Sequence, residues 1–381
     1  MNDRAPPTIL MTADTLGGVW HYAVELAAAL GARGVRVALA TMGAPLTPVQ
    51  RAQIASVPIV AVHESAYKLE WMQDPWRDVA RAGAWLRELE REHKPVLVHS
   101  NQFAFSALQF DAPVVVVAHS CVLSWWRAVH GTTAPRSLDR YKHTVRRGLN
   151  RAALVVAPTG AMLGTLRRNY GYEHGVVIAN GRSAQCYVPG RKEPVIFAAG
   201  RVWDSAKNLT ALETVACGVP WPIRVAGPYS QPDGGSREPS GVQALGELGP
   251  AAIAWQYARA AIYALPARYE PFGLSVLEAA LAGCALVLGD IPSLREVWGS
   301  TALYVPPDDH DALRACLRRL IADDALRGRL ARAARTRALA YSPERMANAY
   351  LRAYDVVLKQ ARPVYRALSQ PTDAETRACA S

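Results

Sequence analysis

Short apolar runs alternate with amphipathic segments along most of the chain. Near its start, residues 8–14 and 35–43 have the composition of buried strands, and 18–34 between them has helical spacing. The same order begins again at 195–200. Because strands that alternate with helices form parallel sheets, the pattern predicts an α/β fold. We expect two doubly wound, Rossmann-like domains, each opening with its own βαβ unit.

The domain boundaries follow from the stretches that lack periodicity. A Gly- and Pro-rich segment at 180–194 is interpreted as the linker. The N-terminal domain is therefore expected at 1–185 and the C-terminal domain at 190–342. Apolar spacing near 3.6 predicts a long helix at 343–362 that rejoins the N-terminal domain, and residues 363–381 are expected to fray.

Composition bounds the class of protein. Half of the 381 residues are apolar and a fifth are charged, which is enough for large cores. No apolar run is long enough for a membrane span or a signal peptide. The six cysteines are scattered without a Cys-x-x-Cys pair, which favours reduced thiols over a disulfide or zinc scaffold. We expect a cytoplasmic protein.

The balance of charge points to anionic partners. A formal net charge of +11 favours phosphorylated ligands, membrane surfaces or nucleic acid without selecting one of them. The basic residues are diffuse and no nucleic-acid-binding motif is present, so nucleic acid is not expected.

Two glutamates flank a Phe-Gly-Leu bend in the segment 267–283. Glu270 follows an apolar strand and Glu278 lies in the helix that comes next. Ligands of open α/β sheets collect at the carboxyl ends of strands, and a carboxylate can accept hydrogen bonds from the two hydroxyls of a sugar diol. Two simpler interpretations stay open: a capping box formed by Ser275 and Glu278, and a solvated loop acid at position 270.

Three loops at predicted strand ends carry further candidates. Arg201 and Lys207 lie in one loop before a helix and suit a diphosphate, although both could be ordinary surface cations. Gly17 and Gly18 let backbone amides approach an anion. Their loop lacks the Gly-x-Gly-x-x-Gly pattern of nicotinamide enzymes. His119 ends an apolar strand, where a structural histidine is the competing interpretation.

These segments, in this order, resemble the retaining glycosyltransferases of family 4, which have the two-domain GT-B fold. The signature Glu-x7-Glu of that family is similar to "PARYEPFGLSVLEAALAG", and its diphosphate loop to "AAGRVWDSAKNL". "TLGGVWHYAVELAAAL" resembles its Gly-Gly loop and helix, and "VVAHS" its active-site histidine strand. Residues 228–251 match the family less clearly, which leaves the nucleotide base open.

The resemblance implies a role for each candidate. Arg201 and Lys207 would hold the donor diphosphate with help from the amides of Gly17 and Gly18. Glu270 would contact the donor sugar and Glu278 the ribose diol, while His119 would lie near the reacting face of the sugar. The bend residues Phe272, Gly273 and Leu274 would line the same donor site.

The resemblance also implies catalysis without a metal ion or another cofactor. A metal-dependent transferase would need Asp-x-Asp, and the one candidate, Asp309-His310-Asp311, is better explained by helix capping. We therefore expect a retaining transferase whose cations and helix amides neutralise the leaving diphosphate.

The acceptor remains open between a glycan, a lipid-linked molecule and a small molecule. Residues 136–154 carry six cations at helical spacing, which fits either a peripheral contact with anionic lipid or an ordinary surface helix. A catalytically silent nucleotide-sugar-binding protein is the alternative function. Donor sugar, linkage and oligomeric state are not specified by the sequence.

Overall fold

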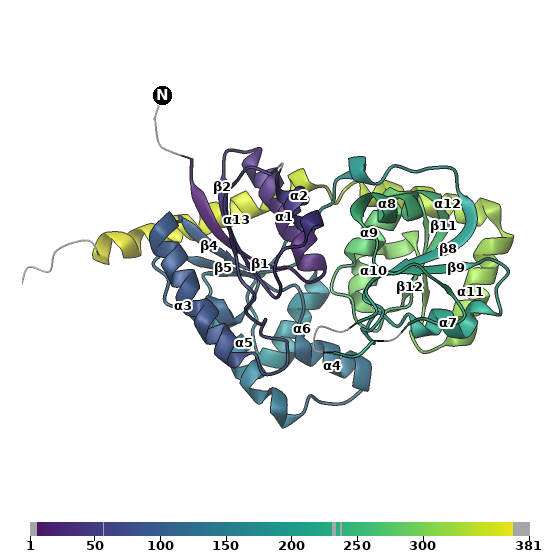
Figure 1. The fold of residues 1–381 in the computed structure, drawn as a ribbon, viewed down its shortest axis with the longest axis horizontal. Coiled ribbons are helices and arrows are strands. Elements are labelled where there is room, and N and C mark those ends of the chain that lie inside the picture. The colour runs from purple at the N-terminus through teal and green to yellow at the C-terminus, as the bar shows by residue number, and fades with distance from the viewer. Residues whose placement is uncertain (1–5, 56, 231–233, 237, 369–381) are drawn as a thin grey trace, which may run out of the picture.

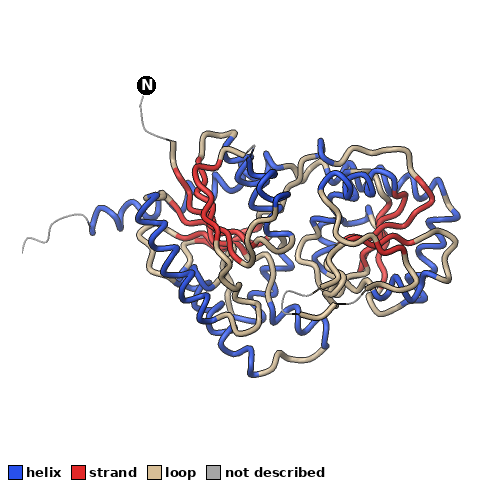
Figure 2. Tube along the Cα trace, in the orientation of Figure 1, coloured by secondary structure: helices blue, strands red, loops and turns tan. Residues whose placement is uncertain are grey.

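The computed structural model describes residues 6–55, 57–230, 234–236 and 238–368. These residues fold into two α/β lobes that lie side by side, with the long last helix returning across the first lobe (Figure 1). In each lobe the strands form a central sheet covered by helices, as the separation of red strands and blue helices makes clear (Figure 2). The predicted α/β architecture is confirmed.

The N-terminal lobe holds a parallel sheet in the order β3-β2-β1-β4-β5-β6-β7. Its strands are β1 (Thr8–Asp14), β2 (Arg36–Met42), β3 (Ile59–Glu64), β4 (Leu97–Ser100), β5 (Val114–Val117), β6 (Leu154–Ala157) and β7 (Val176–Val177). Its helices are α1 (Gly18–Gly31), α2 (Pro48–Ala55), α3 (Trp76–His93), α4 (Val122–His130), α5 (Asp139–Arg151) and α6 (Gly160–Tyr170).

The C-terminal lobe repeats the plan with the parallel order β10-β9-β8-β11-β12-β13. Its strands are β8 (Glu193–Ala199), β9 (Ile223–Ala226), β10 (Gln243–Ala244), β11 (Ala260–Leu265), β12 (Ala285–Gly289) and β13 (Leu303–Val305). Its helices are α7 (Thr210–Ala216), α8 (Pro250–Arg259), α9 (Leu274–Leu281), α10 (Pro292–Trp298), α11 (His310–Ala322) and α12 (Asp324–Ala338).

The strands read as continuous apolar runs because helices cover both faces of each sheet. Every residue of β1, β11 and β12 is buried. Where the predicted elements differ from the structure, they differ mostly at their ends. The helix predicted at 18–34, for example, ends at Gly31, and Gly34 takes a left-handed φ of 76° in the turn to β2.

The chain passes between the lobes at two places that touch one another. The first passage follows β7, and the second leads from α12 into α13 (Pro343–Leu368). The amide of Arg182 in the first passage donates to the carbonyl of Tyr341 in the second, at 3.0 Å. Gly181 is packed so closely that a Cβ there would collide with the Ser342 carbonyl.

Helix α13 packs against the N-terminal lobe. Its residues Met346, Ala347, Tyr350, Tyr354 and Val357 are buried in the same core as α1. The expected helix end at 362 is wrong, because α13 continues to Leu368 and so extends beyond Pro363. A proline removes one backbone hydrogen bond but does not by itself end a helix. The rest of the tail predicted to fray, 369–381, lies outside the described residues.

Among the residues that the structure describes, no helix combines the length and the apolar character needed to span a bilayer. The predicted cytoplasmic location stays a prediction.

A buried histidine links β4 to the returning helix. His99 is inaccessible to solvent, with Nδ1 2.6 Å from the Tyr354 hydroxyl and Nε2 3.2 Å from the Tyr22 hydroxyl. Burial lowers the pKa of His99 to about 3, so the imidazole is neutral at physiological pH. Because the pKa of His99 is lower in the folded than in the unfolded chain, the unfolded chain binds a proton at a higher pH than the folded chain does. The stability from this group is therefore present above pH about 6.5 and lost as the pH falls toward 3.

We predict that His99→Gln lowers the unfolding free energy at pH about 7.5, and that its deficit narrows by about 2 kcal/mol at pH about 5. The change in this free-energy difference between the two pH values reports on His99, because all other titrating groups are common to both proteins. Denaturant unfolding of the two proteins at the two pH values measures it. A deficit that stays the same at both pH values would contradict a neutral buried His99.

Candidate functional site

The loops that follow the carboxyl ends of the strands meet where the two lobes face each other. In the N-terminal lobe they follow β1, β5 and β6, and in the C-terminal lobe they follow β8 and β11. Parallel strands end at a common edge, so residues far apart in the chain converge there. The contacts across the lobes include the Cys121 amide with the Tyr269 hydroxyl (3.0 Å), the Trp125 indole N–H with Asp204 (2.8 Å), and the Thr159 hydroxyl with the Pro271 carbonyl (2.9 Å).

Lys207 and Glu270 form an ion pair in this region. The loop between β8 and α7 carries Lys207, and its Nζ lies 2.5 Å from Oε2 of Glu270, in the turn between β11 and α9. The other carboxylate oxygen accepts the amide of Gly273 at 3.1 Å, and the Ser293 hydroxyl donates to the Glu270 carbonyl at 2.5 Å. Glu270 is only 8% exposed, which rules out the solvated loop acid.

The bend after Glu270 fixes the start of α9. Gly273 has φ of 91° and is the N-cap residue, a left-handed conformation that favours glycine. Phe272 is buried, with its ring 5.6 Å from that of Tyr341. Leu274 packs against the cores of both lobes. The bend thus holds one carboxylate oxygen of Glu270 through the Gly273 amide, and it contacts the cores of both lobes through Leu274.

Arg201 faces the Gly-Gly loop of the other lobe. A Cβ built on Gly17, whose φ is 89°, would lie 3.6 Å from Nη1 of Arg201, and one on Gly18 would lie 3.6 Å from Leu274. The guanidinium is oriented by Asp204, 2.7 Å away, and lies 5.1 Å from the centre of the Trp203 ring. The backbone at Gly17 therefore lies close to the cation, whereas Gly18 faces Leu274.

Asp204 is a buried carboxylate that the sequence analysis did not identify. It accepts the Trp125 indole N–H across the lobes and the Ala206 amide at 3.0 Å. Burial alone would raise its pKa, but the positive charges of Arg201 and Lys207 lower the pKa below the usual value. The hydrogen bond between Trp125 and Asp204 thus links the two lobes.

His119 lies on the N-terminal side and is held in the neutral form. Its Nε2 donates to Oδ1 of Asn101 at 2.7 Å, and its ring packs edge-on against Tyr22 at 4.4 Å. Asn101 in turn donates to the Thr12 carbonyl at 2.6 Å. Burial, then the nearby His99, lowers the pKa of His119 to about 3. Both the structural and the functional interpretation fit this partly exposed ring.

Asp14 at the end of β1 is a second acid that the sequence analysis passed over. Its Oδ1 accepts the Leu16 amide at 2.6 Å, beside the Gly-Gly loop. Burial raises the pKa of Asp14 to about 7, against the lowering influence of that amide and of Arg201. Its charge therefore changes near neutral pH.

Glu278 does not form the capping box. Helix α9 starts at Leu274, so Glu278 lies in its second turn and not at the third helical position that a capping box needs. Ser275 instead accepts the Tyr263 hydroxyl at 2.8 Å. The Glu278 carboxylate is paired with Arg182, whose Nε lies 2.9 Å away.

Arg182 is the main residue that sequence reasoning missed. It leaves the first passage between the lobes and pairs with Glu25 of α1 at 2.8 Å and with Glu278 of α9 at 2.9 Å. It also donates to the Tyr187 hydroxyl and lies over that ring at 5.3 Å. Its side chain is 13% exposed, and although burial alone would lower its pKa, the neighbouring acids raise the pKa above the usual value. One guanidinium thus joins both lobes.

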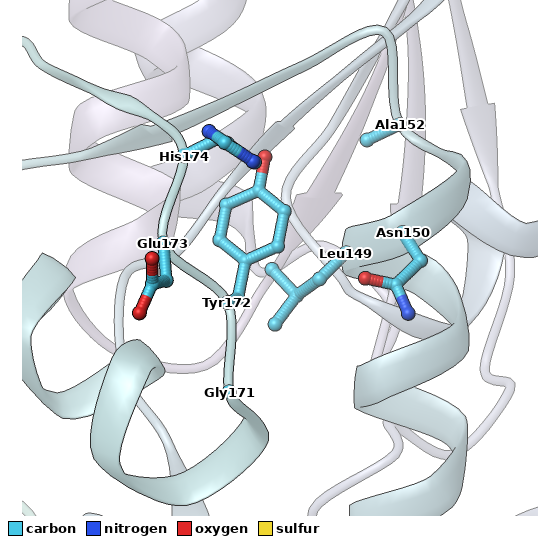
Figure 3. A pocket seen from close by; sticks show the side chains of 7 residues that line it. All are labelled: Leu149, Asn150, Ala152, Gly171, Tyr172, Glu173 and His174. Carbon is cyan, nitrogen blue, oxygen red and sulfur yellow. The ribbon is translucent and has the colours of Figure 1, made fainter.

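Two other features lie apart from this site. Asp309 caps α11 by accepting the Ala312 amide at 2.8 Å, which agrees with the capping interpretation of Asp309-His310-Asp311. A hollow of about 490 Å³ is lined by Leu149, Asn150, Ala152, Gly171, Tyr172, Glu173 and His174 (Figure 3). It precedes β6 and β7, at the amino ends of the strands, and so faces away from Lys207 and Glu270.

Comparison with known proteins identifies the family. Residues 16–185 match the family described as Glycosyltransferase Family 4, and residues 193–323 match Glycosyl transferases group 1. Each lobe is thus covered by its own match. The chain belongs to the family-4 glycosyltransferases.

Two individual proteins are also similar in sequence to this glycosyltransferase. Glycogen synthase of Mycobacterium tuberculosis (strain H37Rv) is 28% identical over 299 residues, 71% of each chain. An O-antigen chain mannosyltransferase B of Escherichia coli is 36% identical over 93 residues, 24% of each chain.

Solved structures show the same fold. Sucrose-phosphate synthase of Thermosynechococcus elongatus has a TM-score of 0.74 at 19% identity, covering 95% of this chain and 99% of that one. Anabaena HepE in complex with UDP and glucose has a TM-score of 0.70 at 15% identity, covering 92% of this chain and 100% of that one. The predicted GT-B arrangement of this glycosyltransferase is therefore confirmed.

We predict that Arg182→Gln lowers the unfolding free energy of this glycosyltransferase by about 3 kcal/mol or more, because it leaves two largely buried carboxylates without their shared cation. Arg33→Gln is the matched control. Arg33, in the turn after α1, likewise links two segments that are far apart in the chain, through a hydrogen bond of 2.7 Å to Asn348 of α13, but at the surface. The Arg33→Gln substitution should lower the unfolding free energy by less than about 1 kcal/mol.

Chemical denaturation of the three proteins measures the difference. If both variants lost the same unfolding free energy, the ion pairs of Arg182 would contribute no more to stability than a surface contact does.

Proposed function

We propose that this chain is a retaining, metal-independent hexosyltransferase that moves a sugar from a nucleoside-diphosphate sugar to an acceptor. The observation that carries the proposal is the convergence of Lys207, Glu270, Arg201 and the Gly-Gly loop where the two lobes meet. Anabaena HepE, which shares this fold, has been solved in complex with UDP, with UDP and glucose, and with UDP-glucose, which supports a donor of this class.

The diphosphate is assigned to the cations. Arg201 offers a planar fork of donors and Lys207 a point charge, and both lie in the loop before α7. The amides of Gly17 and Gly18, at the N-terminus of α1, add donors from the other lobe. In this proposal the diphosphate takes over the contact with Lys207 that Glu270 now makes.

The donor sugar and ribose are assigned to the glutamates. Glu270 keeps one oxygen on the Gly273 amide, so its other oxygen is available for a sugar hydroxyl once the diphosphate binds Lys207. Glu278 shares Arg182 with Glu25, and we propose that its remaining acceptor capacity serves the ribose diol.

The chemical step breaks the bond between the anomeric carbon and the diphosphate oxygen. The acceptor hydroxyl then attacks the same face of an oxocarbenium-like sugar, and its proton passes to the departing phosphate oxygen. Arg201, Lys207 and the helix amides stabilise the charge that develops on the diphosphate. Neutral His119 acts as a polar neighbour of the sugar rather than as a cation.

We predict that Lys207→Ala, Arg201→Ala and Glu270→Gln each lower kcat/KM for transfer by about 100-fold or more, which corresponds to about 2.7 kcal/mol of transition-state stabilisation. The matched control is Lys359→Ala, because Lys359 also pairs with an acid (Asp355, 2.6 Å) but on the exposed face of α13.

The donor is first chosen by thermal shift with a panel of nucleoside-diphosphate sugars, since ligand binding raises stability by mass action. Transfer is then followed by the release of nucleoside diphosphate in buffer with a chelator. Near-normal turnover in any of the three variants would refute its role. A protein that binds a donor tightly but neither transfers nor hydrolyses it would be the silent nucleotide-sugar binder instead.

A lipid-linked acceptor is a second proposal, and it rests on α5. The cations of this region are all exposed in the structure: Arg136, Arg140, Lys142, Arg146, Arg147 and Arg151. Tyr141, Val145 and Leu149 of α5 are buried, so the cations share the outer face. A basic face of this kind is attracted to anionic lipid headgroups.

We predict that the full chain sediments with anionic vesicles at low salt, and that Arg146→Gln/Arg147→Gln weakens this binding by about tenfold or more. Arg329→Gln/Arg332→Gln on α12 is the control with the same charge change, since both residues are exposed on the other lobe. Absence of binding by the wild type, or an equal loss in the control, would remove the lipid proposal.

A further inference from the structure

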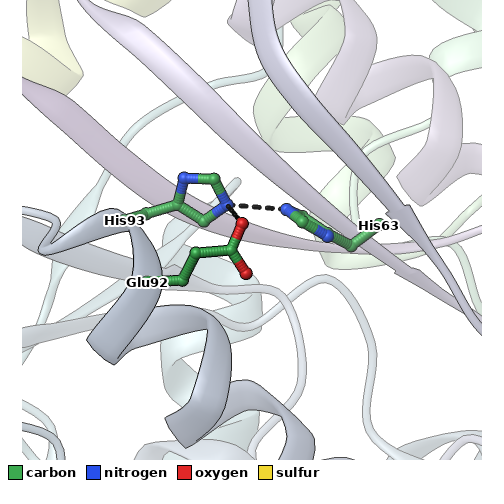
Figure 4. A group of neighbouring side chains, drawn as sticks. All are labelled: His63, Glu92 and His93. Carbon is green, nitrogen blue, oxygen red and sulfur yellow. Dashed lines mark hydrogen bonds and ion pairs between the residues drawn. The ribbon is translucent and has the colours of Figure 1, made fainter.

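A group of metal-ligating side chains lies outside the donor site, on the N-terminal lobe. Within the described part of the chain, His63, Glu92 and His93 bring their ligand atoms within 4.8 Å of one another (Figure 4). The strand β3, which carries His63, is at the outer edge of its sheet, and β2 separates it from β1 and the Gly-Gly loop. The group is therefore not a part of the donor site.

The two imidazoles point their nitrogens at each other. Nε2 of His63 and Nε2 of His93 are 2.6 Å apart, with the ring centres at 4.8 Å and the planes at 63°. Oε1 of Glu92 lies 3.5 Å from the same nitrogen of His93 (Figure 4). His93 is the last residue of α3, thirty positions from His63, so the fold creates this meeting.

This donor set selects a class of metal ion. Imidazole nitrogen with one carboxylate suits Zn²⁺ and its late first-row neighbours, whereas Mg²⁺ and Ca²⁺ need oxygen ligands. Both histidines are partly buried, and Glu92 is more exposed, at 61% of its side chain.

We propose that His63, His93 and Glu92 bind one Zn²⁺ ion that ties the edge strand β3 to the end of α3. Two ligands at about 2.1 Å from a tetrahedral zinc lie about 3.4 Å apart, so the imidazoles separate slightly when the ion enters. His93 is at a helix end and Glu92 at the surface, so both side chains have room to move. Water completes the coordination.

The ion has a structural role in this proposal. An edge strand presents unpaired backbone groups to solvent, and β3 pairs only with β2 within the described sheet. A metal bridge to α3 fixes that edge without touching the donor site. The proposal is independent of the assigned transferase activity, so either can fail without the other.

The test is zinc titration of the full chain by calorimetry, after treatment with a chelator and desalting. We expect one Zn²⁺ per chain, and binding at least tenfold weaker in His63→Ala and in His93→Ala. Glu92→Gln, at an exposed position that the fold does not depend on, should weaken binding by a smaller factor. Co²⁺ in place of Zn²⁺ should give the visible absorption of a site of low coordination number.

His143→Ala is the control, because His143 is an exposed histidine on α5. It should bind zinc as the wild type does. Wild-type protein that binds no Zn²⁺ at about 100 µM would overturn the proposal. The proposal would also be overturned if His63→Ala and His93→Ala bound zinc as tightly as the wild type does, or if His143→Ala lost as much zinc affinity as these two variants.

Discussion

The ion pair between Lys207 and Glu270 is the interaction on which the site depends. Each charge is largely withdrawn from water, and each is held in place by the backbone around it: Lys207 by the loop after β8, Glu270 by the Gly273 amide. Partly buried charges need partners, because desolvation is costly. In the proposed function, an arriving diphosphate would meet a cation that is already positioned, so the ligand would have little ordering to bring about.

Arg182 gives the arrangement its second fixed point. Its backbone touches the other passage between the lobes, while its side chain holds Glu25 on one lobe and Glu278 on the other. The acid that the family resemblance assigns to ribose is therefore part of the joint between the lobes. Any ligand that changes the contacts of Glu278 also changes the contacts that hold the lobes together.

The sequence predicted the features that depend on local pattern. Buried parallel strands appear as apolar runs, and Glu270 and Lys207 were predictable because they follow such runs. The contacts of Arg182 were not, because its partners lie 157 and 96 positions away and leave no local spacing. The capping-box interpretation was wrong, because α9 begins at Leu274 and Ser275 is therefore its second residue and not its N-cap residue. Asp14 and Asp204 escaped notice because burial, not residue type, makes them unusual.

The central claim is that fixed cations, without a divalent metal, recognise the diphosphate. The most direct measurement compares calorimetric binding of a nucleoside diphosphate and of the matching nucleoside to the full chain in the presence of a chelator. We expect the diphosphate to bind at least tenfold more tightly than the nucleoside, and we expect this difference to be lost in the double variant Arg201→Ala/Lys207→Ala. Equal binding of the two ligands, or binding of the diphosphate only after Mg²⁺ is added, would contradict it.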